Sequence, residues 1–320
     1  MSPYWLLFAF PAWMAVTHRS SLLPAYSRDN WSGYWKLMFA VLVLMVGLRH
    51  EVGADWFNYM GHIERAAYHT FSEIVLLGDP GYEFLNWVAN KTGWGPYFVN
   101  TVCAVFFAWG LIAFSRLQPR AWLALTVAVP YLVVVVAMGY TRQGVAIGFA
   151  MLGLVALADR KLLRFAIFIT LAALFHKSAV VLMPLAVLSV KRNRIANLLW
   201  LALFSVLLFR LFLQESVATY QHGYLEAEYQ SSGAVIRVAM NAVPAGLFLW
   251  FRSRFMLSHE ESGFWTAFSL IALAFVVLLQ VSPSTTAVDR LALYLIPLQL
   301  LVLSRLPEIL GRQNGSGNGF

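Results

Sequence analysis

The chain has 320 residues, of which 60% are hydrophobic and only 12% carry a charge, and its mean hydropathy is +0.68. Soluble globular domains carry about 25% charged residues, so the composition excludes an ordinary soluble domain. Apolar runs near the length of a membrane-spanning helix recur from end to end, which predicts an all-α polytopic membrane protein. The net charge of +8 does not indicate nucleic-acid binding, because most basic residues fall in short loops between these runs.

About eleven apolar segments are candidates for membrane-spanning helices. They cover residues 4–16, 33–48, 96–115, 121–138, 142–158, 162–175, 178–190, 195–213, 233–251, 264–281 and 288–304. The first has no basic region before it, so we interpret it as a span and not as a signal peptide. The segments on either side of His176 form either two short helices or one broken helix. We expect residues 1–310 to form a single membrane domain and residues 311–320, rich in Gly, Asn and Ser, to form a disordered cytoplasmic tail.

Basic residues occupy alternate connections between these segments, and the positive-inside rule assigns such connections to the cytoplasm. They are Arg19 and Arg28, Arg116 and Arg120, Arg160 to Arg164, Lys191 to Arg194, Arg252 and Arg254, and Arg305 with Arg312. The N-terminus is therefore predicted to lie outside and the C-terminus inside. The other connections form extracytoplasmic loops at about 49–95, 214–232 and 282–290, of which the first two are rich in carboxylates.

The longest of these loops, 49–95, has helical patterning of its own. An apolar stripe recurs at helical spacing at Trp56, Met60, Ile63 and Ala67. This pattern predicts an amphipathic helix in the plane of the membrane interface, with Tyr59 on its polar side. A turn at Asp79-Pro80-Gly81 then precedes a second short helix.

Four arginines break the positive-inside rule. Arg49, Arg142, Arg237 and Arg290 lie at or just inside the predicted outer ends of apolar segments. Guanidinium groups bind phosphate bidentately, so together they predict an extracytoplasmic site for an anionic ligand. The alternatives are that Arg49 and Arg142 extend to lipid headgroups and that Arg290 pairs with Asp289 or with another outer carboxylate.

Short motifs along the chain carry a resemblance. Arg49 ends a span and is followed by Val52-Gly53-Ala54-Asp55. Further motifs follow in order: Asp79-Pro80-Gly81-Tyr82-Glu83, Thr141-Arg142-Gln143-Gly144, Phe175-His176-Lys177-Ser178-Ala179, and Asp289-Arg290 with Tyr294. Over about residues 40 to 300 the chain resembles the EpsG/Wzy-type family of bacterial polysaccharide polymerases, which make O-antigen and exopolysaccharide.

The resemblance implies a GT-C-like membrane glycosyltransferase in the bacterial inner membrane. It would join oligosaccharide repeat units carried on undecaprenyl pyrophosphate at the outer leaflet, without a nucleotide sugar. A flippase and a chain-length regulator are the partners that such a pathway implies. The residues predicted to bind the pyrophosphate or glycan are Arg49, Arg142, Gln143, Lys177, Arg237, Asn241, Asp289, Arg290 and Tyr294.

Glycosyl transfer also needs a base to accept the proton of the attacking hydroxyl. The sequence offers Asp55, Glu83, His62, His176 and Asp289, and the catalytic residues we predict are Asp55, His176 and Glu83, with Asp55 the best motif match. No His, Asp or Glu cluster has metal-ligand spacing, so no cofactor is predicted, although Mg²⁺ held loosely on the substrate pyrophosphate stays open.

Three other functions are compatible with parts of the pattern. A ligase would move the same lipid-linked glycan onto a different acceptor, and the sequence barely separates it from a polymerase. A transporter or flippase of lipid-linked sugars would place polar residues near the membrane midplane, whereas the unusual charges here gather toward one face. A membrane transpeptidase would need Cys103 as its nucleophile, and Cys103 lies inside an apolar run.

Overall fold

The computed structural model describes residues 2–18, 31–53, 55–74, 76–189, 231 and 233–311, and the isolated positions 199, 202, 203 and 206. The chain is helical throughout these ranges, so the predicted all-α class is confirmed. The predicted tail after Gly311, the loop 214–232 apart from Ser231, and most of the predicted span 195–213 lie outside the described residues.

Four helices in the described ranges are long and apolar enough to cross a membrane. They are α6 (Gly95–Ser115), α8 (Thr141–Ala158), α12 (Ala234–Phe251, continued by η5, Arg252–Phe255) and α13 (His259–Val281). Each coincides with a predicted span. A fifth is reached if α14 (Thr285–Ala292), η6 (Leu293–Leu295) and α15 (Pro297–Gly311) count as one bent span. Multi-pass membrane character is therefore supported.

The prediction of about eleven spans is wrong, and helix length is the first reason. The helices α1 (Ser2–Thr17), α2 (Gly33–Gly47) and α9 (Leu162–Phe175) have 16, 15 and 14 residues. At 1.5 Å per residue they are about 21–24 Å long, whereas a hydrocarbon core of roughly 30 Å needs about 20 residues. Hydropathy identified these segments as apolar but did not show where each helix ends.

Proline is the second reason. The predicted span 121–138 divides into α7 (Ala121–Ala128) and a π-helical segment η1 (Val129–Ala137) with Pro130 in its first turn. The predicted span 178–190 is a 3-10 helix, η2 (Lys177–Ser189), that contains Pro184. The predicted span 288–304 bends by 49° just before Pro297. Proline lacks a backbone N–H and clashes with the preceding turn, so it interrupts a regular α-helix.

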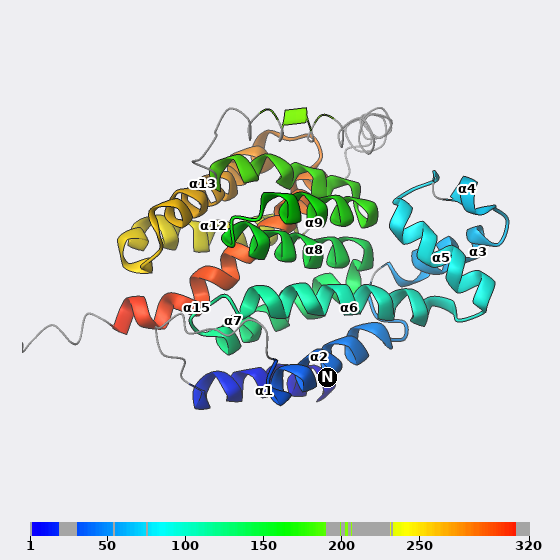
Figure 1. The fold of residues 1–320 in the computed structure, drawn as a ribbon, viewed down its shortest axis with the longest axis horizontal. Helices are drawn as coiled ribbons and strands as arrows, with labels where there is room; N and C mark the ends of the chain where they lie inside the picture. The colour runs from blue at the N-terminus through cyan, green and yellow to red at the C-terminus, as the bar shows by residue number, and fades with distance from the viewer. Residues whose placement is uncertain are drawn as a thin grey trace, which may run out of the picture.

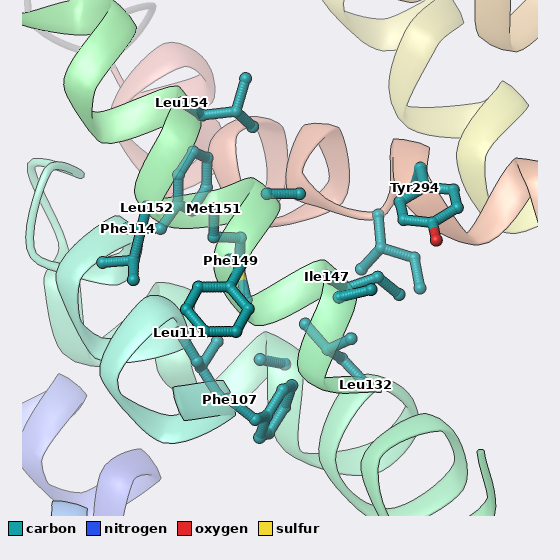
Figure 2. Close-up of a cluster of buried hydrophobic side chains, with 14 of the residues drawn as sticks. Phe107, Leu111, Phe114, Leu132, Ile147, Phe149, Met151, Leu152, Leu154 and Tyr294 are labelled. Atoms are coloured by element: carbon teal, nitrogen blue, oxygen red, sulfur yellow. The ribbon is translucent and has the colours of Figure 1, made fainter. Parts of the chain in front are cut away.

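Helix α8 is the centre of the bundle. It lies between α6 and α9 and is buried along almost its whole length (Figure 1). Figure 2 shows the core that surrounds it, where Phe107 and Leu111 of α6 lie near Phe149 of α8. At the α6–α8 crossing Gly110 faces Gly148, and each leaves room for the other helix's backbone. Such close approach of helices requires small residues.

Replacing Gly148 with alanine is expected to destabilise this crossing. The added Cβ would lie 2.6 Å from the Cα of Phe107, a backbone atom that cannot move alone. Overpacking of this kind costs about 1–3 kcal/mol, which a lowered thermal unfolding temperature in detergent would reveal. Gly246→Ala in α12 is the matched control, because its Cβ would meet no atom within 4 Å. Equal unfolding temperatures for the two variants would contradict this packing.

The loop 49–95 folds into a helical unit beyond the ends of α6 and α8 (Figure 1). It contains α3 (Trp56–Ala66), α4 (Phe71–Ile74) and α5 (Pro80–Thr92), and α5 packs on α6 and α9. The predicted amphipathic helix is confirmed as α3. Its buried face, however, includes Tyr59, which was assigned to the polar side, and this face packs against α5. Trp56 and Ile63 of the apolar stripe are thus buried inside the protein, whereas Ala67 is exposed. Placement of this helix at the membrane interface stays a prediction.

Candidate active site

Most of the predicted site residues meet at one end of the bundle. Arg142 begins α8, His176 ends α9, Asp79 precedes α5, and Arg290 lies on α14. The predicted cytoplasmic arginine Arg160 follows the opposite end of α8. Arg142 and Arg160, which the sequence assigned to different sides, are therefore separated by the length of this helix.

Asp79 connects three elements of the site. Its carboxylate is buried and accepts a hydrogen bond of 3.0 Å from Nη1 of Arg142 and one of 3.1 Å from the backbone N–H of Lys177. Burial raises the pKa of Asp79, although Arg142 and Lys177 act in the opposite direction. The sequence analysis missed Asp79 as a site residue, despite its place in the Asp-Pro-Gly-Tyr-Glu motif. This pairing orients Arg142 at the start of α8.

His176 contacts one hydroxyl group, which in turn contacts a second. The Ser178 hydroxyl lies 2.6 Å from Nδ1 of His176 and 3.2 Å from the hydroxyl of Tyr294. Burial, together with the positive charges of Arg142 and Arg290, lowers the pKa of His176 to about 3. The imidazole is therefore neutral near pH 7 and is a weak proton acceptor. This argues for a positioning role of His176 and against its predicted role as the base.

His176 is expected to make the protein sensitive to acid. An unfolded imidazole titrates near 6.5, so between pH 6.5 and about 3 the unfolded chain binds the proton more readily than the folded one. This contribution is complete above pH 6.5 and is lost on acidification by roughly 1.4 kcal/mol per pH unit. We expect the unfolding temperature in detergent to fall between about pH 7.5 and pH 5.5, and to fall less in His176→Gln. Equal losses in both proteins would contradict this assignment.

Arg290 differs from the other arginines of the site in its contacts within the described residues. The backbone carbonyl of Arg290 accepts a hydrogen bond from Nε2 of Gln143, which holds α14 against the start of α8. Its guanidinium makes no ion pair or hydrogen bond within the part of the chain that the structure describes, and the residue is half-buried. Its charge influences both His176 and Tyr59. The predicted alternative, an ion pair of Arg290 with Asp289, does not form.

Asp289 pairs with Arg237 instead. The Nε of Arg237 donates to Oδ1 of Asp289, and Ser231 donates to Oδ2 at 3.1 Å. One turn along α12, the Asn241 amide donates to the carbonyl of Ala292 at 2.7 Å. These contacts attach α12 to α14, so the predicted residues Arg237, Asn241 and Asp289 hold the helix that carries Arg290.

Arg49 lies just after the end of α2 and is buried. Its guanidinium donates to the carbonyl of Val46 at 2.6 Å and to Oδ1 of Asn100 at 3.1 Å, and also to the hydroxyl of Thr141. Both Nη groups of Arg49 are thus used by the protein, whereas its buried Nε has no hydrogen-bond partner among the described residues. The contact with Thr141 anchors the residue that precedes Arg142. Neither Asn100 nor Thr141 was predicted as a site residue, because a polar residue in an apolar helix does not show which partner it meets.

The two predicted carboxylate catalysts differ in their surroundings. Asp55 is partly exposed directly before α3, and its carboxylate accepts a 3.4 Å hydrogen bond from Asn58. Glu83 is fully buried in α5, where Oε1 lies 2.7 Å from Nδ1 of His62. Within the described ranges no three His, Cys, Asp or Glu side chains converge as a metal site would require.

The comparison with protein families agrees with the motifs. The family model described as the EpsG family matches residues 34–316, which include every site residue discussed above. The chain belongs to the EpsG family. This family is associated with exopolysaccharide biosynthesis, so the resemblance noted from the sequence is confirmed. Searches of curated proteins and of solved structures found no match for this EpsG-family protein.

Proposed function

We propose that this protein is a membrane-embedded glycosyltransferase that joins oligosaccharide repeat units carried on undecaprenyl pyrophosphate. The observation that carries the proposal is the guanidinium of Arg290, half-buried and without a partner in the described residues, at the end of the bundle where Arg142 lies. A half-buried cation without a protein partner is costly. A bound anion such as a pyrophosphate would be a suitable partner for this cation.

The arrangement suits the chemistry of a pyrophosphate leaving group. When the glycosidic bond of the donor breaks, negative charge develops on the pyrophosphate oxygens. A guanidinium presents two parallel N–H groups that stabilise such charge. Arg142 is already oriented by Asp79, and Gln143 holds the backbone of Arg290. Charge stabilisation on a preorganised frame supplies much of the rate acceleration in reactions of this kind.

The location of the site supports a polymerase over a transporter. The residues of the network, from Asp79 to Asp289, gather at one end of the bundle, whereas a transporter places its binding residues near the middle of the membrane. The positive-inside rule puts this end at the outer leaflet of a bacterial inner membrane. A flippase that delivers the lipid-linked repeat and a chain-length regulator would then be its partners. The transpeptidase alternative loses its support because Cys103 is buried in α6.

Purified protein in lipid nanodiscs, supplied with a lipid-linked repeat unit, tests the proposal. Analysis of the lipid-linked products by mass should show chains that grow by whole repeat units. Transfer of one repeat to a different acceptor would instead indicate a ligase. Movement of the substrate across a liposome membrane without elongation would indicate a transporter and overturn the proposal.

A further inference from the structure

His62 and Glu83 form a buried pair that the sequence did not show. They come from different helices, α3 and α5, and Nδ1 of His62 lies 2.7 Å from Oε1 of Glu83. The Glu83 side chain is fully buried, whereas the His62 side chain is 14% exposed. The second carboxylate oxygen, Oε2, has no hydrogen-bond partner among the described residues. The imidazole of His62 is therefore the group that contacts the buried carboxylate. Of these two side chains, only the imidazole reaches solvent.

The short contact between His62 and Glu83 needs one hydrogen between the two atoms. An ionised carboxylate has acceptors only, so opposite an ionised Glu83 the hydrogen belongs to Nδ1 of His62. In that arrangement the lone pair of a neutral imidazole lies on Nε2. A carboxylate that orients an imidazole in this way prepares it to accept a proton and stabilises the imidazolium that results.

The pair adjoins the arginine site through one aromatic ring. The ring of Tyr82 lies 5.7 Å from that of His62, and the guanidinium of Arg142 lies 5.9 Å from the centre of the same ring. Tyr82 precedes Glu83 in α5, whose N-terminus follows Asp79. One helix therefore carries the carboxylate that orients Arg142, the ring between the two sites, and the carboxylate that orients His62.

The other candidate bases lack the combination of partial exposure and an orienting carboxylate that His62 has. Within the described residues the partly exposed carboxylate of Asp55 contacts only Asn58, at 3.4 Å. Asp289 is occupied by Arg237 and Ser231. Nδ1 of His176 is occupied by the Ser178 hydroxyl, and no carboxylate orients its ring among the described residues. Among these groups, His62 alone combines partial exposure with a buried carboxylate that orients it.

We propose that His62 is the catalytic base of this protein and that Glu83 is its positioning residue, an inference that rests on the glycosyltransferase function proposed above. The hydroxyl oxygen of the acceptor sugar forms a bond to the anomeric carbon of the donor. The bond from that carbon to the pyrophosphate breaks, and its electron pair stays on the pyrophosphate. The hydroxyl proton passes to Nε2 of His62 and is later released to water.

His62→Ala tests this step. A general base contributes about 10²–10⁴-fold to rate, so we expect kcat for elongation to fall by that factor while KM for the lipid-linked substrate stays within about threefold. Added imidazole should restore part of kcat, which a purely structural role of His62 would not allow. Glu83→Gln should also lower kcat, because a neutral amide stabilises the imidazolium less well.

His69→Ala is the matched control. His69 belongs to the same helical unit and lies 3.8 Å from Glu73, but both side chains are substantially exposed, so its kcat should equal that of the wild type. His62→Gln serves if His62→Ala does not fold, since it keeps a polar side chain without a base. Turnover within threefold of the wild type in a folded His62 variant overturns the inference alone. A wild-type protein that does not elongate the substrate overturns the proposed function instead.

Discussion

Replacing Arg290 with alanine is expected to reduce elongation at least a hundredfold while the protein stays folded and inserted in the membrane. The guanidinium of Arg290 has no partner within the described part of the chain, so its removal breaks no ion pair there. Loss of one preorganised donor to a developing oxyanion costs about 10²–10³ in kcat. Arg290→Lys should recover only part of the rate, because an ammonium group cannot bind two phosphate oxygens in the same planar geometry. The measurement is elongation of a lipid-linked repeat in nanodiscs.

Arg160→Ala provides the control for this experiment. Arg160 follows the opposite end of α8, its side chain is largely exposed, and it pairs with Glu260. Its replacement should leave the elongation rate unchanged. Arg142→Ala should also abolish elongation, but it leaves the buried carboxylate of Asp79 without its guanidinium, so stability must be measured alongside. Normal polymer length in both Arg142→Ala and Arg290→Ala would refute the binding of pyrophosphate at this site.

Replacing Asp289 with alanine is expected to have the largest effect on stability. It leaves the charge of Arg237 largely buried without its carboxylate, and breaking a buried ion pair in this way costs about 3–5 kcal/mol. Elongation should fall as well, because the Arg237–Asp289 contact holds α14 and with it Arg290. The double variant Arg237→Met/Asp289→Leu should regain most of the stability, since an apolar pair of similar volume replaces a buried ion pair at little cost, but it should not regain full activity.

The matched control for this pair is Glu308→Ala. Glu308 pairs with Arg120 at 3.3 Å, and both side chains are more exposed than those of Arg237 and Asp289. More exposed ion pairs contribute about 0–1 kcal/mol, so the unfolding temperature in detergent should hardly change. If Asp289→Ala is as stable as Glu308→Ala, the pair does not hold α14 in place.

The spans that the sequence predicted well are those without an interruption. The helices α6, α8, α12 and α13 coincide with predicted spans because hydropathy was sustained over the 18 or more residues that a membrane requires. The prediction failed where a short helix or a proline intervened, as at Pro130 and Pro297. Mean hydropathy does not distinguish a helix of 14 residues from one of 20 when both are followed by apolar residues.

The candidate site, like the spans, was predicted only in part from the sequence. Its arginines were recognisable because a permanent charge beside an apolar segment is rare on the predicted outer side. The separate roles of these arginines could not be recognised from the sequence. Arg49 is a buried anchor, Arg237 is one half of an ion pair, and Arg290 has no partner in the described residues. Each role depends on what another helix brings near. For that reason Asp79 was not predicted as a site residue, and His62 was named only as one of five candidate bases.

The sequence by itself determined that this is an all-α membrane protein of the EpsG family, with unusual arginines that share one predicted face. These properties follow from composition, hydropathy and short motifs, which are local along the chain. Only the tertiary structure showed which arginine has no partner among the described residues. It also showed where the buried face of α3 packs and that His62 contacts Glu83. Those facts depend on contacts between residues far apart in sequence. Burial and hydrogen bonding, which set the charge state and role of each side chain, arise only when the helices pack together.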